Sequence, residues 1–293
     1  MSRTLREIET QPECWRRAAA LAPTHRGALP APGERVAVIG CGTSWFIAQA
    51  FAAIREATSQ GETDAFTATE LPAGRRYDRL LAISRSGTTT EVIRALERGG
   101  AAGAPATAVT AVAGSPLAGL ADFSVVLDFA DEESVVQTRS ATSALALLRA
   151  HLGEDLDPAV ADAERALAAK LPVDPSAFDH FVFLGAGWTV GLANEAALKL
   201  REACQAHTES YPAMEYRHGP VSLAGPRSLV WILGSPDTGV ATDVATTGAT
   251  VRTAQLDPMA ELVLIQRMAV ALAAARGLDP DQPRHLTRSV VLS

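Results

Sequence analysis

The sequence predicts an α/β protein made of two similar halves, each a doubly wound parallel sheet. Short apolar runs alternate with helical patterns along the chain, which is typical of strand–helix–strand units. This order restarts near residue 180. Ile39-Gly40-Cys41-Gly42 and Leu184-Gly185-Ala186-Gly187 lie 145 residues apart, and each follows a predicted strand and precedes a predicted helix. The matching turns and their matching surroundings indicate an internal repeat.

Each element has its own sequence signal. A short apolar run predicts a buried strand, and a longer pattern with the helical period predicts a helix. In the first half these signals predict strands 35–40, 80–84, 106–113 and 124–129 and helices 43–55, 89–98 and 140–151. In the second half, after an Ala-rich helix within 152–179, they predict strands 180–185, 228–234 and 249–255 and helices 192–206 and 260–276.

The predicted domain organisation follows these elements. Residues 1–34 are expected to form a helical arm and a linker, with Pro12 as a break or a helix start. The first subdomain is predicted over 35–151 and the second over 152–265. Residues 266–293 are predicted to complete the last helix and form a tail.

Composition limits the class of protein. A chain of 293 residues suits about two domains, and 47% hydrophobic with 20% charged residues is typical of a globular protein. The net charge of −7 argues against a nucleic-acid partner. Cys14, Cys41 and Cys204 lack the spacing of a disulfide framework or a zinc site. The polar N-terminus and the lack of a long apolar stretch predict a cytoplasmic protein without a membrane partner.

Residues 82–91 place five hydroxyl groups around Gly87, where a predicted strand gives way to a helix. The hydroxyls belong to Ser84, Ser86, Thr88, Thr89 and Thr90. A helix N-terminus presents unpaired N–H groups and a partial positive charge, so it attracts anions. The segment therefore predicts a site for a small phosphorylated ligand, which hydroxyl and N–H groups can hold without a metal.

Three other interpretations apply to residues 82–91 and to the two Gly-x-Gly turns: an ordinary helix cap, a nucleotide P-loop and a dinucleotide site. Ser and Thr are favoured N-caps of any helix, so an ordinary cap explains a single hydroxyl. No lysine follows Gly87, which excludes the nucleotide P-loop. Trp45 and Val190 stand where the dinucleotide fingerprint needs a third glycine, which argues against a dinucleotide site.

Three charged residues recur on one face of the helix predicted over 192–206. Glu195, Lys199 and Glu202 fall at i, i+4 and i+7. On the helix alone, this pattern favours a solvated face. In a cleft, the same groups could serve as a proton-transferring base and as a cation that stabilises an oxyanion.

Residues 207–220 form a polar run that is typical of a long loop, and such loops on α/β scaffolds often carry function. His218 precedes Gly-Pro in this run and so is predicted to lie in a rigid turn, where it could transfer protons. A loop histidine bonded to the backbone is the open alternative.

These segments together resemble the sugar isomerase (SIS) domain family. The matching motifs are Gly40-Cys-Gly-Thr-Ser44, Ser84-Arg-Ser-Gly-Thr-Thr89, Glu133-Ser-Val-Val-Gln-Thr138, Glu195-Ala-Ala-Leu-Lys-Leu-Arg-Glu202, Glu215-Tyr-Arg-His-Gly-Pro220 and Asp281-Gln-Pro-Arg-His-Leu-Thr-Arg288. They cover nearly the whole chain in order and look most like the isomerase part of glucosamine-6-phosphate synthases (glutamine–fructose-6-phosphate aminotransferases), standing alone. The resemblance implies two flavodoxin-like SIS subdomains.

The resemblance also implies where a substrate binds. Ser84, Ser86 and Thr89, together with Ser44, correspond to residues that bind the 6-phosphate of a hexose. Thr43 and Val136 correspond to residues that line the sugar pocket.

Catalytic roles follow from the same resemblance. Glu202 corresponds to the base that moves a proton between C1 and C2, and Lys199 and Glu195 to the groups that support it. His218 corresponds to the residue that opens the sugar ring and that reaches in from the neighbouring subunit. The resemblance therefore implies a homodimer with shared active sites, and it implies no metal and no cofactor.

Three departures from the family pattern change what is expected. Arg288 stands where the synthases have a lysine that forms a Schiff base with a ketose, and a guanidinium is a poor imine former, so Arg288 is expected to contact substrate oxygens. Arg85 replaces a glutamine, and its cation is expected to strengthen phosphate binding or to contact a second acidic group. The chain opens on Met1-Ser2 without a glutamine-hydrolysing domain, so its activity is expected to be glutamine-independent.

The function expected from these observations is aldose–ketose isomerisation of a hexose or amino-sugar 6-phosphate by C1–C2 proton transfer. A deaminating isomerase is included, and its reversal with ammonia would count as aminotransferase-like activity. The alternatives are a fructosamine-6-phosphate deglycase and a non-catalytic sugar-phosphate sensor. Glu202 and His218 weigh against the sensor, because a sensor needs no base.

Overall fold

The computed structural model describes residues 2–100, 103–234 and 239–292, which form two compact units. The first unit comprises Glu13–Leu156 and Thr287–Ser293, and the second comprises Met1–Pro12 and Asp157–Leu286. The C-terminal tail therefore belongs to the first unit. The four-segment division expected from the sequence stays a prediction.

The first unit contains a five-stranded parallel sheet. Its strands are β1 (Val36–Gly40), β2 (Thr63–Thr67), β3 (Arg79–Ile83), β4 (Ala106–Thr110) and β5 (Phe123–Val126). Their order is β2-β1-β3-β4-β5, which is the flavodoxin order. The predicted doubly wound fold is confirmed for this half.

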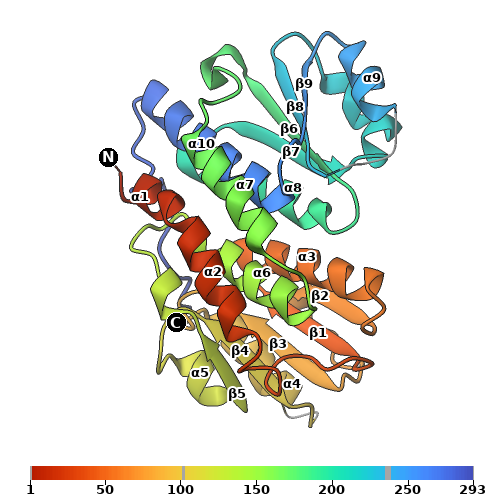
Figure 1. Ribbon diagram of the computed structural model, residues 1–293, viewed down its shortest axis with the longest axis vertical. Coiled ribbons are helices and arrows are strands. Elements are labelled where there is room, and N and C mark those ends of the chain that lie inside the picture. Colours follow the sequence, from red (N-terminus) through yellow and green to blue (C-terminus); the bar gives the residue numbers. More distant parts are fainter. Residues whose placement is uncertain (1, 101–102, 235–238, 293) are drawn as a thin grey trace. The chain divides into compact units, whose positions relative to one another are not determined.

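Helices cover both faces of this sheet (Figure 1). The helices and 3-10 turns of the unit are most of α2 (Gln11–Leu21), α3 (Thr43–Ala57), η1 (Ala68–Glu70), α4 (Thr90–Gly100), α5 (Pro116–Leu120), η2 (Asp128–Ala130) and α6 (Arg139–His151). One face packs its buried side chains against α4 and α5, and α3 and α6 cover the other face. Successive strand residues point to opposite faces, so the strands buried on both sides are mainly apolar.

The second unit contains a four-stranded parallel sheet of the same kind. Its strands are β6 (His180–Gly185), β7 (His207–Pro212), β8 (Ser228–Ile232) and β9 (Thr250–Thr253), in the order β7-β6-β8-β9. The surrounding elements are α1 (Arg3–Glu9), α7 (Asp157–Ala168), η3 (Pro175–Ala177), α8 (Thr189–Cys204), η4 (Glu215–His218), η5 (Pro220–Leu223), α9 (Val240–Ala245) and α10 (Pro258–Ala275). The order repeats that of the first four strands of the other sheet, which confirms the predicted pair of similar halves.

The two glycine turns of the repeat have the same geometry. Gly42 has φ 54° and Gly187 has φ 55°, a left-handed conformation that favours glycine. The strand-ending glycines also match, because a Cβ on Gly40 would lie 2.7 Å from the Ser44 carbonyl carbon and one on Gly185 would lie 2.4 Å from the Thr189 oxygen. Each helix therefore starts in contact with the strand that precedes it.

Several sequence expectations about elements are wrong, mainly at sheet edges. β2 and β7 were missed, and 207–212 was expected to be a loop. Both strands lie at the edge of a sheet and are only partly buried, so they are polar and lack an apolar run. The strand expected over 106–113 ends at Thr110, whose hydroxyl donates to the Arg85 carbonyl at 3.1 Å as the chain turns.

By length and composition, α10 is the one helix in the described chain that could cross a membrane, and 67% of it is buried. It packs against α7 and α8 within the second unit. A buried core helix gives the same signal, so this is weak evidence for a membrane span.

We expect Gly185→Ala to destabilise the protein, because its new methyl group would overlap the backbone of Thr189. The loss in the free energy of unfolding should be about 1–3 kcal/mol, typical of forced overpacking. Urea denaturation followed by circular dichroism measures it. Gly27→Ala is the matched control, since nothing lies within 4 Å of its added Cβ. Equal midpoints for the two variants would contradict the close approach.

Candidate functional site

The first unit reverses its strand order between β1 and β3. In such sheets, ligands bind beyond the carboxyl ends of the strands at this switch point. Residues 41–42 follow β1 and residues 84–89 follow β3, so both predicted ligand-binding segments lie there.

Hydroxyl groups organise the loop between β3 and α4. Ser84 Oγ accepts from the Gly87 amide at 3.2 Å, and Ser86 Oγ accepts from the Thr88 amide at 3.2 Å and from its hydroxyl at 3.0 Å. The hydroxyls of Ser84 and Thr89 lie 3.5 Å apart. An ordinary helix cap would make such bonds as well, so they leave the capping alternative open.

A small polar cavity of about 30 Å³ lies beside this loop. The structure brings six predicted residues to its wall: Ser44, Ser84, Arg85, Ser86, Thr89 and Arg288. Cys41 and Gln137 also line it, although neither was predicted as a site residue. Thr43 and Val136 are buried close by in sequence but are not among its lining residues.

The C-terminal tail lies along the loop. Ser289 Oγ is 3.1 Å from Ser86 Oγ and 2.9 Å from Thr88 Oγ1. The Thr90 amide, in the first turn of α4, donates to the Val290 carbonyl at 3.2 Å. Groups that could bind an anion are therefore partly engaged by the chain itself.

Glu132 holds the segment that carries Val136. Its carboxylate accepts from the Thr138 amide at 2.6 Å, the Thr138 hydroxyl at 2.7 Å and the Arg139 amide at 2.9 Å. The Glu132 side chain is fully buried, so these bonds replace its lost hydration.

Arg85 connects that segment to the tail. Its guanidinium donates to the Ser134 carbonyl at 2.7 Å and to the Arg288 carbonyl at 2.6 Å, and lies 3.8 Å from Glu132 Oε2. Only 5% of the residue is exposed. The cation thus contacts the chain's own carbonyls and carboxylate, and its contact with an acidic ligand stays a prediction.

Arg288 is also engaged within the first unit. Its Nε donates to the Glu132 carbonyl at 3.1 Å, and its guanidinium pairs with Asp131 at 2.5 Å. The side chain is 39% exposed, so one side of it remains open to solvent. Its contact with substrate oxygens stays a prediction.

In the second unit, α8 presents the predicted charged stripe. Lys199 Nζ lies 2.6 Å from Glu202 Oε2 and 3.3 Å from Glu195 Oε1. The side chains of Glu195 and Lys199 are 1% exposed, whereas that of Glu202 is 20% exposed. A solvated face is therefore excluded, and Glu202 is the member of the stripe that a solute can reach.

Electrostatics keep Lys199 charged. Burial alone would lower the pKa of its ammonium, but the neighbouring charges of Glu195 and Glu202 and their hydrogen bonds outweigh burial and raise it. The arrangement can hold a carboxylate as an oriented base and offers a cation near a developing oxyanion.

His218 ends a short 3-10 turn that is fixed from two sides. Tyr216 is fully buried in the core of the second unit, and Arg217 pairs with Asp243 at 2.7 Å. His218 itself is exposed, and within the described chain its ring makes no hydrogen bond. The alternative of a histidine bonded to the backbone is therefore not supported.

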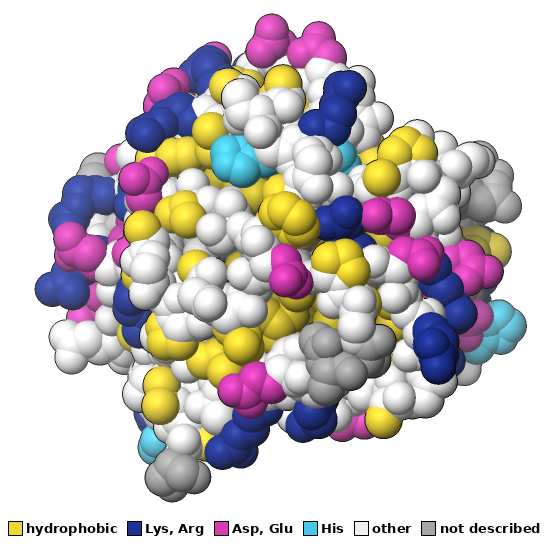
Figure 2. All heavy atoms as spheres, turned by 90° about the horizontal axis from the view of Figure 1, so that it is seen from below, with side chains coloured by type: hydrophobic (Ala, Val, Ile, Leu, Met, Phe, Trp, Pro, Cys, Tyr) yellow, Lys and Arg dark blue, Asp and Glu magenta, His cyan; other side chains and the backbone are white. Residues whose placement is uncertain are grey.

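The described residues contain no group of three or more His, Cys, Asp or Glu side chains placed to hold a metal ion. Figure 2 shows acidic and basic side chains interspersed on one face, with hydrophobic side chains between them. The absence of a nucleic-acid partner and of a cofactor stays a prediction.

Sequence reasoning missed Asp131, Glu132 and Ser289. Residues 131–133 are three consecutive acids, and no pattern says which of them is buried. Ser289 is one hydroxyl in a tail whose path depends on contacts with residues 86–90, about two hundred positions away.

Comparison with known proteins finds similarity to one domain family and to one class of enzyme. A model of the SIS domain family matches residues 31–152. The chain is 29% identical to a glutamine–fructose-6-phosphate aminotransferase (isomerizing) of Pyrobaculum aerophilum and 27% identical to one of Aeropyrum pernix. Each alignment covers 98% of this chain and 57% of the relative, so the chain spans little more than half the length of these relatives.

Solved structures of similar length also match. A glucosamine-6-phosphate deaminase from Thermotoga maritima has a TM-score of 0.85 and 26% identity, and covers 99% of this chain and 100% of its own. A tagatose-6-phosphate ketose/aldose isomerase from Escherichia coli has a TM-score of 0.82, covering 100% of this chain and 96% of its own. At 20% identity, that second likeness shows the fold alone.

We expect Lys199→Met to destabilise the protein by about 3–5 kcal/mol at pH 7, because it leaves buried carboxylates without their cation. Lys199 has a raised pKa, so its contribution is fully present below the ordinary lysine value of about 10.4 and is lost as pH rises through its higher folded value. The difference between wild type and variant should therefore shrink only at strongly alkaline pH.

Urea denaturation from pH 7 to 11 measures this difference. The matched control is Lys170→Met, which changes the chain's only other lysine at an exposed position. Equal losses in the two variants at pH 7 would mean that the buried ion pairs do not stabilise the fold.

Proposed function

We propose that the chain is a member of the SIS domain family, a model of which matches residues 31–152, and that it acts on a hexose or amino-sugar 6-phosphate. The proposed reaction is aldose–ketose isomerisation by proton transfer between C1 and C2. With a 2-amino sugar, the same proton transfer gives a 2-imine, and water then adds at C2 to give the ketose and release ammonia. The observation that carries the proposal is the Glu195–Lys199–Glu202 stripe, because burying charges requires costly desolvation and such groups cluster at functional sites.

The phosphate would bind to the first unit at the switch point between β1 and β3. Ser84, Ser86 and Thr89 supply hydroxyl donors beside the N-terminus of α4, and Ser44 lies on the wall of the same cavity. The cavity is too small for a sugar phosphate while Ser289 contacts Ser86. Binding would therefore displace the tail from these hydroxyls.

Proton transfer would fall to Glu202. Its carboxylate is held by Lys199 and partly exposed, as a base that must reach a substrate requires. The buried charge of Lys199 would favour the developing enediolate through space, without direct contact, and Glu195 would fix the ammonium between two carboxylates. Burial strengthens the Glu195–Lys199 interaction most, since both side chains are shielded from water.

Deamination without glutamine is the form of the reaction that we favour. The support is the likeness, over nearly all of both chains, to the Thermotoga maritima glucosamine-6-phosphate deaminase. Arg288 supports the same choice, because a guanidinium engaged with Asp131 is unsuited to imine formation with a ketose. We place the reaction in the cytoplasm.

A deglycase and a non-catalytic sensor are the competing functions. The deglycase shares the C1–C2 chemistry and would differ in the amine that leaves. A sensor would need Ser84, Ser86 and Thr89 but not a buried ammonium between carboxylates, so the α8 stripe favours an enzyme.

The experiment is NMR in D₂O with glucosamine, galactosamine, glucose and fructose 6-phosphates, followed by an ammonia assay. Wild type should incorporate deuterium at C1 or C2. Glu202→Gln should lose at least about 100-fold in exchange rate, because an amide cannot accept the proton. Ammonia release from an amino sugar would identify the deaminase.

Glu97→Gln is the matched control, since Glu97 is an exposed carboxylate on α4, and it should keep the wild-type rate. Saturable binding without exchange for every sugar would overturn the isomerase and support the sensor. Release of an amine from a fructosamine 6-phosphate alone would support the deglycase.

We further propose a homodimer in which His218 acts in the partner's site. Its exposed ring is carried on a fixed turn, beside exposed apolar side chains of Met214 (44%) and Leu223 (64%) that a second copy could cover. If sites are shared, mixing inactive Glu202→Gln and His218→Asn variants should restore up to about a quarter of the activity, because half of the reassociated dimers are mixed and each has one complete site. No recovery after subunit exchange would contradict shared sites.

A further inference from the structure

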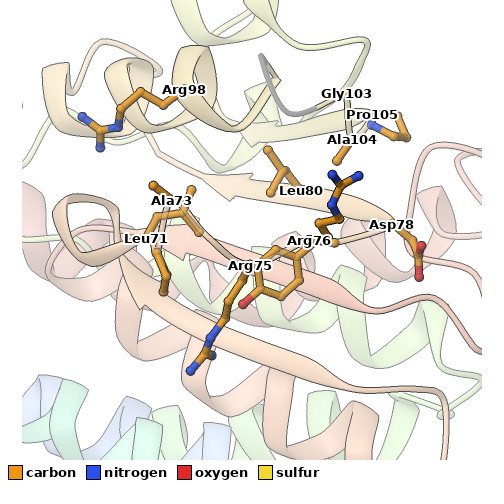
Figure 3. A pocket seen from close by; sticks show the side chains of 12 residues that line it. Leu71, Ala73, Arg75, Arg76, Asp78, Leu80, Arg98, Gly103, Ala104 and Pro105 are labelled. Carbon is orange, nitrogen blue, oxygen red and sulfur yellow. The ribbon is translucent and has the colours of Figure 1, made fainter.

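A second cavity in the first unit lies away from the predicted phosphate loop. It has a volume of about 440 Å³, within the range of small-molecule sites. Its wall comes from the connection between β2 and β3, the start of β3, the end of α4 and the approach to β4 (Figure 3). All of these elements belong to one unit.

This cavity and the phosphate loop lie at opposite ends of β3. Leu80, near the start of the strand, lines the cavity, and Ser84 follows the strand's last residue. In a parallel sheet, the amino ends of the strands share one edge and the carboxyl ends share the other. The cavity is therefore a second site and not a part of the first.

Apolar side chains form part of its wall. Leu80 is 2% exposed, and Leu71, Ala104 and the ring of Tyr77 also line the space. Tyr77 is held in place, because its hydroxyl donates to Asp64 at 2.7 Å and its ring packs edge-on against Phe66. A rigid apolar wall favours a planar, apolar part of a ligand.

Two arginines line the cavity from different elements, and the Arg98 guanidinium also donates to the Ala68 carbonyl at 3.5 Å. Figure 3 shows Arg98 at the end of α4 and Arg76 in the β2–β3 connection, with Leu80 between them. Neither arginine forms an ion pair with any described residue. By contrast, Arg75 pairs with Asp64 at 3.2 Å and points away from the other two.

An acidic group nearby limits what these arginines can hold. The carboxylate of Asp78 also lines the cavity and accepts from the Arg35 amide at 2.8 Å. The C-terminal end of α4 adds partial negative charge. A bare inorganic anion would gain little here, so the apolar contacts must contribute to binding.

We propose that this cavity binds a small organic anion with a planar apolar body and one or two phosphate, sulfonate or carboxylate groups. The body packs on Leu71, Leu80 and Tyr77, and the anionic groups bind Arg76 and Arg98. Guanidinium groups suit such oxyanions because they donate paired hydrogen bonds. This inference does not rest on the proposed sugar-phosphate reaction.

The test is fluorescence titration of the full chain with the aromatic sulfonate 1-anilinonaphthalene-8-sulfonate. Wild type should bind it saturably while its near-UV circular dichroism shows an intact fold. An Arg76→Gln/Arg98→Gln double variant should bind at least 10-fold more weakly. Arg94→Gln, which changes an exposed arginine on α4 outside the cavity, should bind like wild type.

Two further measurements separate this site from the phosphate loop and from a plain anion site. Ser84→Ala/Ser86→Ala should leave the dye affinity unchanged, and inorganic phosphate should compete at least 10-fold less well than the dye binds. The proposal is overturned by an unchanged affinity in the double arginine variant, by loss of binding in the serine variant, or by competition from phosphate as strong as the dye itself.

Discussion

Both halves of this protein depend on one steric constraint, the contact between the glycine that ends a strand and the first turn of the helix that follows. No side chain fits at Gly40 or Gly185, because a Cβ would meet the backbone of Ser44 or Thr189. Because of this contact, each helix begins at the edge of its sheet where the carboxyl ends of the strands lie. It brings the N-terminus of α3 and the hydroxyl of Ser44 to the switch point of the first unit, and it sets where α8 begins in the second.

The same framework supports different chemistry in the two units. The first presents hydroxyl and N–H donors, held by the buried Glu132 carboxylate and the Arg85 guanidinium. The second buries an ammonium between two carboxylates on α8, where Coulomb attraction has to exceed the cost of desolvation. Each arrangement suits one part of the proposed reaction, in which the first would hold a dianion and the second would move a proton.

The fold and the central strands could be predicted from the sequence, because β1, β3 and β6 consist mainly of apolar residues and the glycine turns after β1 and β6 repeat. The strands β2 and β7 could not be predicted, because their sequences are polar and they form strands only by pairing with β1 and β6. Local patterns and resemblance predict Ser84 and Lys199 as site residues, but the burial of Lys199 depends on distant packing. The contact of Ser289 with Ser86 depends on the path of the tail, which no local signal records.

The most direct test of the account is a crystal structure of the protein saturated with glucosamine 6-phosphate. The account predicts the phosphate beside α4, within hydrogen-bond distance of the hydroxyls of Ser84, Ser86 and Thr89, with Ser289 displaced from Ser86. A phosphate bound elsewhere, for instance between Arg76 and Arg98, with the Ser289 contact intact, would contradict it.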